Sequence, residues 1–205
     1  LAHCILHGHT AYDLSEADAQ RFAPVFNSLD HLMARAPEIL GTHYAIAYPG
    51  KQLETARDLR RLPLDADYRA AKAHMGQFYG WERPLYFGKA AEPQMTFTRP
   101  DWFENVRAEV MAAHTGAAIF DATTFGKIDV AGPGAETLLA KVCAGHVGRP
   151  PGSVIYSAML NDRGTFASDI TVQRIAADHY RLFVGTSAIK RDLVWLNRQS
   201  DGLDV

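Results

Sequence analysis

The second half of the chain shows the apolar spacing of helices and of short strands in turn. Apolar side chains recur at helical spacing in three segments, 101–116, 133–145 and 189–196. Apolar and polar side chains alternate, as in half-buried strands, in four others, 128–130, 154–160, 166–174 and 180–184. The order of these segments predicts an α+β fold with mostly antiparallel sheets and packed helices.

The first half has a less regular pattern. Residues 1–7 read as the end of a helix that stops at Gly8, and His43–Tyr48 alternates like a short strand closed by Pro49 and Gly50. Residues 78–87 are rich in aromatic side chains, and residues 88–100 have the glycine and proline content of a linker. The chain begins inside an amphipathic run and ends as a strand begins, so we expect a fragment of a larger multidomain protein.

Composition excludes several functional classes. Hydrophobic residues make up 47% of the 205 residues, which is enough for a packed core. The 21 basic and 23 acidic side chains give a net charge of −2, which argues against nucleic-acid and anionic-membrane partners. No apolar run approaches the roughly 20 residues of a membrane span. Two cysteines, Cys4 and Cys143, form neither a disulfide framework nor a zinc site by themselves.

The turn Asn161-Asp162-Arg163-Gly164 joins two predicted strands and determines which side chains share a face. A two-residue loop would place Tyr156 directly opposite Asp169, with their Cβ atoms about 5 Å apart. A three-residue loop with Gly164 left-handed would shift the register by one residue and separate the two side chains. The residues leave both registers open.

Asp169 is the unusual residue of its strand because aspartate is disfavoured in strands and costly to bury. Ile170 and Val172 take the opposite face, so Asp169 shares its side with Thr171. One interpretation is an exposed aspartate on the wet face of the sheet. The alternative is a carboxylate that orients or charges a substrate amine.

Other candidates have simpler explanations. His3 and His7 have a spacing that suits zinc, but no further ligand completes the set, which favours an exposed helix end. Cys143 lies on the apolar face of its helix, as a buried structural thiol would. Trp81 and its aromatic neighbours could stack on a ligand or pack between domains. The glycines at 126, 132 and 134 do not form a phosphate-binding loop.

Two stretches resemble known proteins. The first resembles the central region of dimethylglycine and sarcosine dehydrogenases, flavoproteins that oxidise N-methyl amines. Its matching strings are His43-Tyr44, Tyr48-Pro49, Ala56-Arg57, Pro63-Leu64 and Gly80-Trp81-Glu82-Arg83-Pro84. From about residue 101 the chain resembles the folate-binding domain of the glycine cleavage T-protein, an aminomethyltransferase. The matching strings there are Ala118-Ile119-Phe120-Asp121, Phe125-Gly126-Lys127-Ile128, Tyr156-Ser157-Ala158-Met159-Leu160-Asn161 and Ser168-Asp169-Ile170-Thr171-Val172.

The resemblance implies roles for four residues. An aspartate at the position of Asp169 is the main catalytic residue of that family and lies near the reacting folate nitrogens. The tyrosine at the position of Tyr156 lines the pterin site, and the residue at Phe125 also faces the folate. Thr171 is the next residue along the same strand face. We therefore expect Asp169 to be catalytic and Tyr156, Phe125 and Thr171 to bind the cofactor, with no metal.

The resemblance further implies an enzyme that uses FAD and tetrahydrofolate. Residues 1–22 would end the FAD-dependent domain, residues 23–92 would form the central dehydrogenase domain and linker, and residues 93–205 would begin the folate-binding domain. The parent would demethylate dimethylglycine or sarcosine and form 5,10-methylenetetrahydrofolate, while this fragment alone would be inactive.

Several features of the parent stay open at this point. Either oxygen or an electron-transfer protein would reoxidise its flavin, and it would be cytoplasmic, or in the mitochondrial matrix of a eukaryote. The alternatives are a stand-alone aminomethyltransferase and a non-catalytic folate-binding module. A further alternative is a purely structural domain in which Asp169 is simply solvated.

Overall fold

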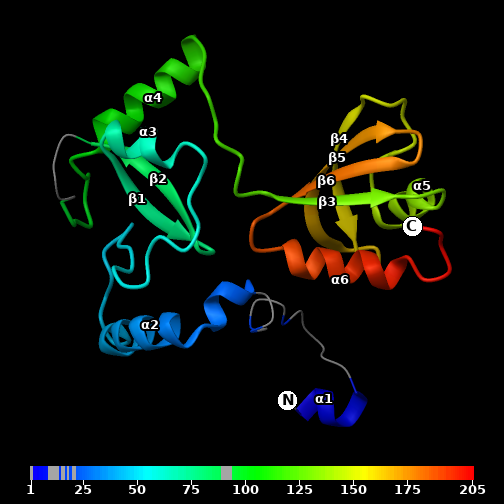
Figure 1. The fold of residues 1–205 in the computed structure, drawn as a ribbon, viewed down its shortest axis with the longest axis horizontal. Helices are drawn as coiled ribbons and strands as arrows, with labels where there is room; N and C mark the ends of the chain where they lie inside the picture. Colours follow the sequence, from blue (N-terminus) through cyan, green and yellow to red (C-terminus); the bar gives the residue numbers. More distant parts are fainter. Residues whose placement is uncertain (1, 9–13, 15–16, 18, 20–21, 89–93) are drawn as a thin grey trace. The chain divides into compact units, whose positions relative to one another are not determined.

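The computed structural model describes residues 2–8, 14, 17, 19, 22–88 and 94–205 (Figure 1). The chain divides into two units, one of residues 23–124 and one of residues 1–22 and 125–205. Each unit has its own elements and is described by itself. The predicted linker at 88–100 includes residues 89–93, which lie outside the described residues.

The unit of residues 23–124 is built around a two-stranded antiparallel sheet of β1 (Ala73–Phe78) and β2 (Trp81–Phe87). Tyr79 and Gly80 form the two-residue turn between the strands, and both have positive φ, as such a turn requires. Its helical elements are the 3-10 turn η3 (Pro24–Asn27) and the helices α2 (Leu29–Thr42), α3 (Asp65–Ala70) and α4 (Phe103–Thr115).

The buried carboxylate of Glu82 connects two parts of this unit. Glu82 on β2 is fully buried and accepts hydrogen bonds from the Arg57 side chain and from the backbone N–H of Asp58. Arg57 also donates to the backbone oxygen of Met75 on β1. Burial alone would raise the pKa of Glu82, but the bonds from Arg57 and Asp58 outweigh it and hold that pKa below its usual value. This ion pair therefore ties the loop before α3 to the sheet.

The strand predicted at His43–Tyr48 is wrong. His43 caps the C-terminus of α2, and the residues after it form turns and irregular chain. Tyr44 and Ile46 are 95% and 87% exposed, so the alternation has no buried face and no partner strand. The spacing of Asp101 and Glu104 also resembles a helix-start capping box, but α4 has no side-chain cap, and Glu104 pairs with Arg99 instead.

The other unit contains a four-stranded antiparallel sheet in the order β3-β6-β5-β4. Its strands are β3 (Gly126–Ala131), β4 (Val154–Leu160), β5 (Phe166–Ala176) and β6 (His179–Val184). Its helices are α1 (Ala2–His7), α5 (Ala135–Val142) and α6 (Ile189–Gln199). Antiparallel strands with α5 and α6 packed on one face confirm the predicted α+β fold.

The core of this unit lies on one face of the sheet. Alternate strand residues pack against α5 and α6 in a buried cluster that includes Leu138, Leu139, Ile170, Leu182 and Leu196. The opposite face of the sheet presents the residues between them, among them Tyr156, Asp169 and Thr171. We call this surface the open face. The alternation predicted from sequence for β4, β5 and β6 is confirmed.

Candidate functional site

Asn161 and Thr165 extend the pairing beyond β4 and β5, which leaves a loop of three residues, 162–164. The Asn161 N–H donates to the Thr165 oxygen, the Gly164 N–H donates to the Asn161 oxygen, and Gly164 has φ of +71°. These bonds define the longer of the two predicted loops, with a glycine in the left-handed region where it costs no strain. By itself that loop would place Tyr156 and Asp169 on opposite faces of the hairpin.

A β-bulge in β5 returns Tyr156 and Asp169 to the same face of the hairpin. Leu160 pairs with Phe166, but Met159 pairs with Ser168, so Ala167 is one extra residue on β5. Beyond the bulge Tyr156 lies opposite Thr171, and Asp169 lies opposite Ala158. The expectation that a three-residue loop would separate Tyr156 from Asp169 is therefore wrong, because a second shift of one residue follows the first.

Tyr156 and Asp169 are in contact as diagonal neighbours on the open face. The phenol of Tyr156 donates a hydrogen bond of 3.3 Å to Oδ2 of Asp169. Tyr156 is 74% exposed and Asp169 is also exposed. The negative charge of Asp169 raises the pKa of Tyr156, since it disfavours a second negative charge nearby. The pair thus offers a carboxylate and an aromatic ring to solvent side by side.

A row of side chains crosses the open face next to this pair. Tyr156 lies opposite Thr171, Thr171 opposite Phe183, and Phe183 opposite Lys127. Phe125 immediately precedes β3 and is 50% exposed. Three of the four predicted site residues, Tyr156, Asp169 and Thr171, therefore lie on adjacent strands of the open face, and Phe125 lies just outside the sheet, before β3.

Sequence reasoning missed three residues near this site. Phe183 lies in the row described above, and the alternation of β6 could have found it. Ser168 and Asp192 lie beneath the open face, where the Ser168 hydroxyl donates a hydrogen bond of 2.8 Å to Asp192 Oδ2. Asp192 is 1% exposed, and burial raises its pKa. No spacing in the sequence joins Ser168 to Asp192.

The other candidates take no part in this arrangement. Cys143 is buried, and burial raises the pKa of its thiol to about 11, which keeps it protonated. His3 and His7 have ring centroids 4.4 Å apart on α1. In the part of the chain that the structure describes, no three histidine, cysteine or acidic side chains could hold a metal ion together.

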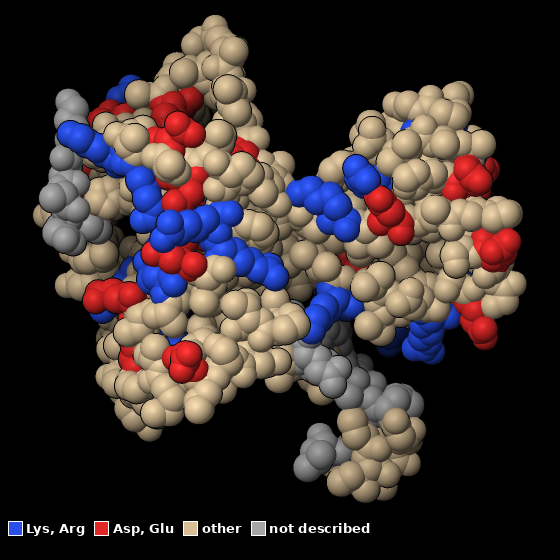
Figure 2. Space-filling view, in the orientation of Figure 1, with Lys and Arg blue, Asp and Glu red and all other residues tan. Residues whose placement is uncertain are grey.

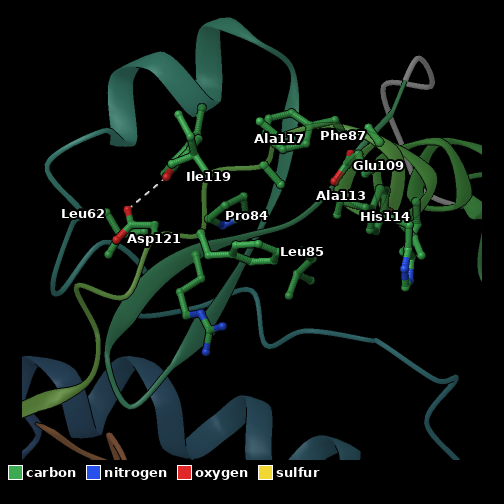
Figure 3. A pocket seen from close by; sticks show the side chains of 18 residues that line it. Leu62, Pro84, Leu85, Phe87, Glu109, Ala113, His114, Ala117, Ile119 and Asp121 are labelled. Carbon is green, nitrogen blue, oxygen red and sulfur yellow. Dashed lines mark hydrogen bonds between the residues drawn. The ribbon is translucent and has the colours of Figure 1, made fainter. Parts of the chain in front are cut away.

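A concave surface lies in the unit of residues 23–124. It is a groove of about 720 Å³ between β2, α4 and residues 117–121 (Figure 3). Inside it the Tyr68 hydroxyl donates to Asp121 at 3.0 Å, the bond drawn as a dashed line. Figure 2 shows basic and acidic side chains interspersed on the visible face of each unit, so neither presents a surface of one sign there. Of the described helices, none has the length and hydropathy of a membrane span.

Comparison with protein families shows which family this chain belongs to. Residues 64–205 match the GCVT N-terminal domain, and residues 7–61 match the FAD dependent oxidoreductase central domain. The chain belongs to the GCVT N-terminal domain family. In this member, the oxidoreductase match that precedes the GCVT match confirms the predicted resemblance to dimethylglycine and sarcosine dehydrogenases.

Individual relatives of this GCVT-family chain include oxidoreductases and a regulatory protein. The 4-methylaminobutanoate oxidase (formaldehyde-forming) of Paenarthrobacter nicotinovorans is 31% identical and covers 98% of this chain and 25% of its own. The mouse pyruvate dehydrogenase phosphatase regulatory subunit is 28% identical, covering 97% and 24%. Human mitochondrial sarcosine dehydrogenase is 30% identical, covering 87% and 22%. The chain spans about a quarter of the length of these relatives.

A solved structure shares the fold of this GCVT-family chain. The glycine cleavage system aminomethyltransferase T from Bartonella henselae matches with a TM-score of 0.55 and 24% identity. The match covers 72% of this chain and 37% of that one. This likeness supports the α+β architecture described above.

Proposed function

We propose that this chain is part of a flavoprotein that oxidatively demethylates dimethylglycine or sarcosine and transfers the one-carbon unit to tetrahydrofolate. The observation that carries the proposal is the 3.3 Å contact between Tyr156 and Asp169 on the open face. It places an exposed carboxylate beside an exposed ring, which is what a cationic amine and a flat pterin would need. The similarity to 4-methylaminobutanoate oxidase and to sarcosine dehydrogenase supports the reaction class.

Side chains on and beside the open face support folate binding. Tyr156 and Phe125 are exposed rings that a pterin could stack on, and Thr171 lies opposite Tyr156 on β5. Asp169 could accept hydrogen bonds from folate N–H groups, since an ionised carboxylate is a strong acceptor. We therefore assign Asp169 as the catalytic residue and Tyr156, Phe125 and Thr171 as folate-binding residues.

The two glycines Gly132 and Gly134 offer no site for FAD. Gly132 and Gly134 pack against the C-terminal residues, and the Gly134 N–H already donates to the Asp204 oxygen. These glycines therefore form no phosphate-binding loop. We place FAD in a part of the parent outside this chain, where it would accept the hydride equivalent taken from the N-methyl group.

Asp169 would act after that oxidation, on the methylene iminium of the amine. Bound tetrahydrofolate would supply two N–H nitrogens that both become bonded to the methylene carbon. The amine would leave as the demethylated product with one of their protons, and the other proton would go to solvent. Asp169 offsets the positive charge on the substrate and folate nitrogens while they react. Holding both reactants on one face also replaces a bimolecular encounter. The product is 5,10-methylenetetrahydrofolate.

A stand-alone aminomethyltransferase agrees less well with the oxidoreductase match over residues 7–61. The match to a regulatory subunit favours a second candidate, a folate-binding module without catalysis. We propose a cytoplasmic location, or the mitochondrial matrix in a eukaryotic host. Reoxidation of the flavin by oxygen or by an electron-transfer protein is compatible with either location.

The test uses the full-length parent turning over dimethylglycine or sarcosine. Formaldehyde and 5,10-methylenetetrahydrofolate are measured with and without tetrahydrofolate. We expect folate to suppress formaldehyde release while methylenetetrahydrofolate accumulates. Unchanged formaldehyde release would favour the non-catalytic module, and failure to oxidise either amine would refute the substrate class.

A further inference from the structure

The position of Asp169 depends on one extra residue in β5. The loop pairs Leu160 with Phe166, and if that register continued, Asp169 would lie opposite Ser157. Ser157 is 5% exposed on the buried face of the sheet. The bulge at Ala167 turns every later side chain of β5 to the other face, because side chains alternate with a period of two. Any contact that stabilises the bulge therefore also keeps Asp169 on the open face.

Ser168 is the first residue after the bulge, and its side chain is hydrogen-bonded to α6 on the buried face of the sheet. It is 4% exposed, and its hydroxyl donates to Asp192 in the first turn of α6 at 2.8 Å. The other oxygen of Asp192 accepts from Nε of Arg191 at 3.0 Å. A carboxylate as deeply buried as Asp192 needs these donors, because burying an unpaired charge is costly.

The alternative register would be penalised by the same carboxylate. Without the bulge Ser168 would turn to the open face, and Asp192 would lose its hydroxyl donor. Asp169 would turn toward the buried side, where Asp192 lies. Two carboxylates brought together in a buried site repel each other strongly. Asp192 thus favours the observed register both by binding Ser168 and by excluding Asp169.

Two further residues of α6 hold the same hairpin. Nε1 of Trp195 donates to the backbone oxygen of Leu160, the last residue of β4, at 3.1 Å. Nε2 of Gln199 donates to Asp162 in the loop, also at 3.1 Å. Positions 192, 195 and 199 share one face of a helix. This face of α6 therefore contacts the bulge, the end of β4 and the loop in order.

We propose that Asp192 is a positioning residue, which through Ser168 holds β5 in the register that keeps Asp169 beside Tyr156 on the open face. The inference rests on the function proposed above for Asp169. Asp192 itself is buried beneath the sheet, so it would act through Ser168. Its role is to determine where the catalytic carboxylate lies.

The functional test compares variants in the full-length parent. Asp192→Ala and Ser168→Ala should each lower the rate of methylenetetrahydrofolate formation, Asp192→Ala by about 100-fold. Asp192→Asn should restore most of that rate, because its amide oxygen still accepts from Ser168. Asn197→Ala, on the exposed side of α6, is the matched control. Equal rates for Asp192→Ala and the control would overturn the proposal.

A cross-link reports the register without relying on activity. Val154 and Gln173 are directly paired, so cysteines at both positions would have Cα atoms about 5 Å apart, within reach of a disulfide. In the slipped register residue 173 would turn to the other face. We expect the disulfide to form readily in the Val154→Cys/Gln173→Cys parent and about tenfold more slowly when Asp192→Ala is added. Equal rates of formation would overturn the role of Asp192 in register.

The two readouts separate the inference from the proposed function. If Asp192→Ala slows the cross-link but Asp169→Asn leaves methylene transfer unchanged, the register role stands and the catalytic role of Asp169 fails. If Asp169→Asn abolishes transfer while Asp192→Ala changes neither readout, the proposed function stands and the positioning role fails.

Discussion

Tyr156 donates a hydrogen bond to Asp169 although the two residues are not directly paired across the β4–β5 hairpin. They meet as diagonal neighbours, which long aromatic side chains can reach. The loop shifts the pairing by one residue and the bulge at Ala167 shifts it by another, so the two shifts together return both side chains to one face.

Asp169→Asn in the full-length parent should uncouple amine oxidation from methylene transfer. Asparagine keeps the size of the side chain but removes the charge that offsets the cationic intermediate, a loss of about 100-fold in methylenetetrahydrofolate formation. Formaldehyde release in the presence of folate should rise correspondingly. A mutant that forms methylenetetrahydrofolate at the normal rate would show that the assigned role is wrong.

The same substitution should lower the pKa of Tyr156. The charge of Asp169 raises that pKa in the native protein, so removing the charge makes ionisation of the phenol easier. Titration of ring-labelled tyrosine by NMR, assigned with Tyr156→Phe, would measure the change. An unaltered titration of Tyr156 would mean that the two groups are not in contact in solution.

Stability of the unit of residues 23–124 should fall in acid. The Thr55 hydroxyl and the backbone N–H groups of Glu54 and Thr55 bind Glu38 and lower its pKa from 4.5 to about 2. A lowered pKa stabilises the folded state above the unfolded value, and that contribution is lost as the pH falls from about 4.5 toward 2. Urea unfolding across this range should show the loss, and Glu38→Gln should show a smaller pH dependence than the native chain.

Glu82→Gln should destabilise the same unit by about 3 kcal/mol, because it leaves the Arg57 charge next to a buried neutral group. Urea unfolding at neutral pH measures the change. Glu54→Gln is a suitable control, since the Glu54 side chain is exposed. A loss no larger than that of the control would contradict the structural role of the ion pair.

Gly126→Ala should destabilise the unit that carries the open face, by about 1–3 kcal/mol. A Cβ at this position would lie 2.4 Å from Cγ1 of Ile189 and 2.7 Å from Cγ2 of Val184, so α6 or β6 would have to move. Thermal unfolding would measure the loss. If the variant were as stable as the native chain, the close approach of α6 to β3 would be refuted.

Sequence pattern predicts the sheet of the open face well, because β4, β5 and β6 alternate between buried and exposed residues along their length. It does not predict the bulge, since one extra residue such as Ala167 leaves no periodic signal. In the other unit α2 escapes prediction because Pro37, usually a helix breaker, lies inside it. At residues 43–48 the opposite error occurs. The residues alternate as in a strand, but no strand pairs with them in the described structure.

The order of strands β3-β6-β5-β4 has a consequence for the time course of folding. β4, β5 and β6 follow one another along the chain and pair as successive hairpins, whereas β3 must pair with β6 across all of the intervening chain. Contacts between residues close in sequence form sooner because less loop entropy is lost. We therefore expect Tyr156 and Asp169 to come together early, and Phe125 to join them only when β3 docks last at the edge of the sheet.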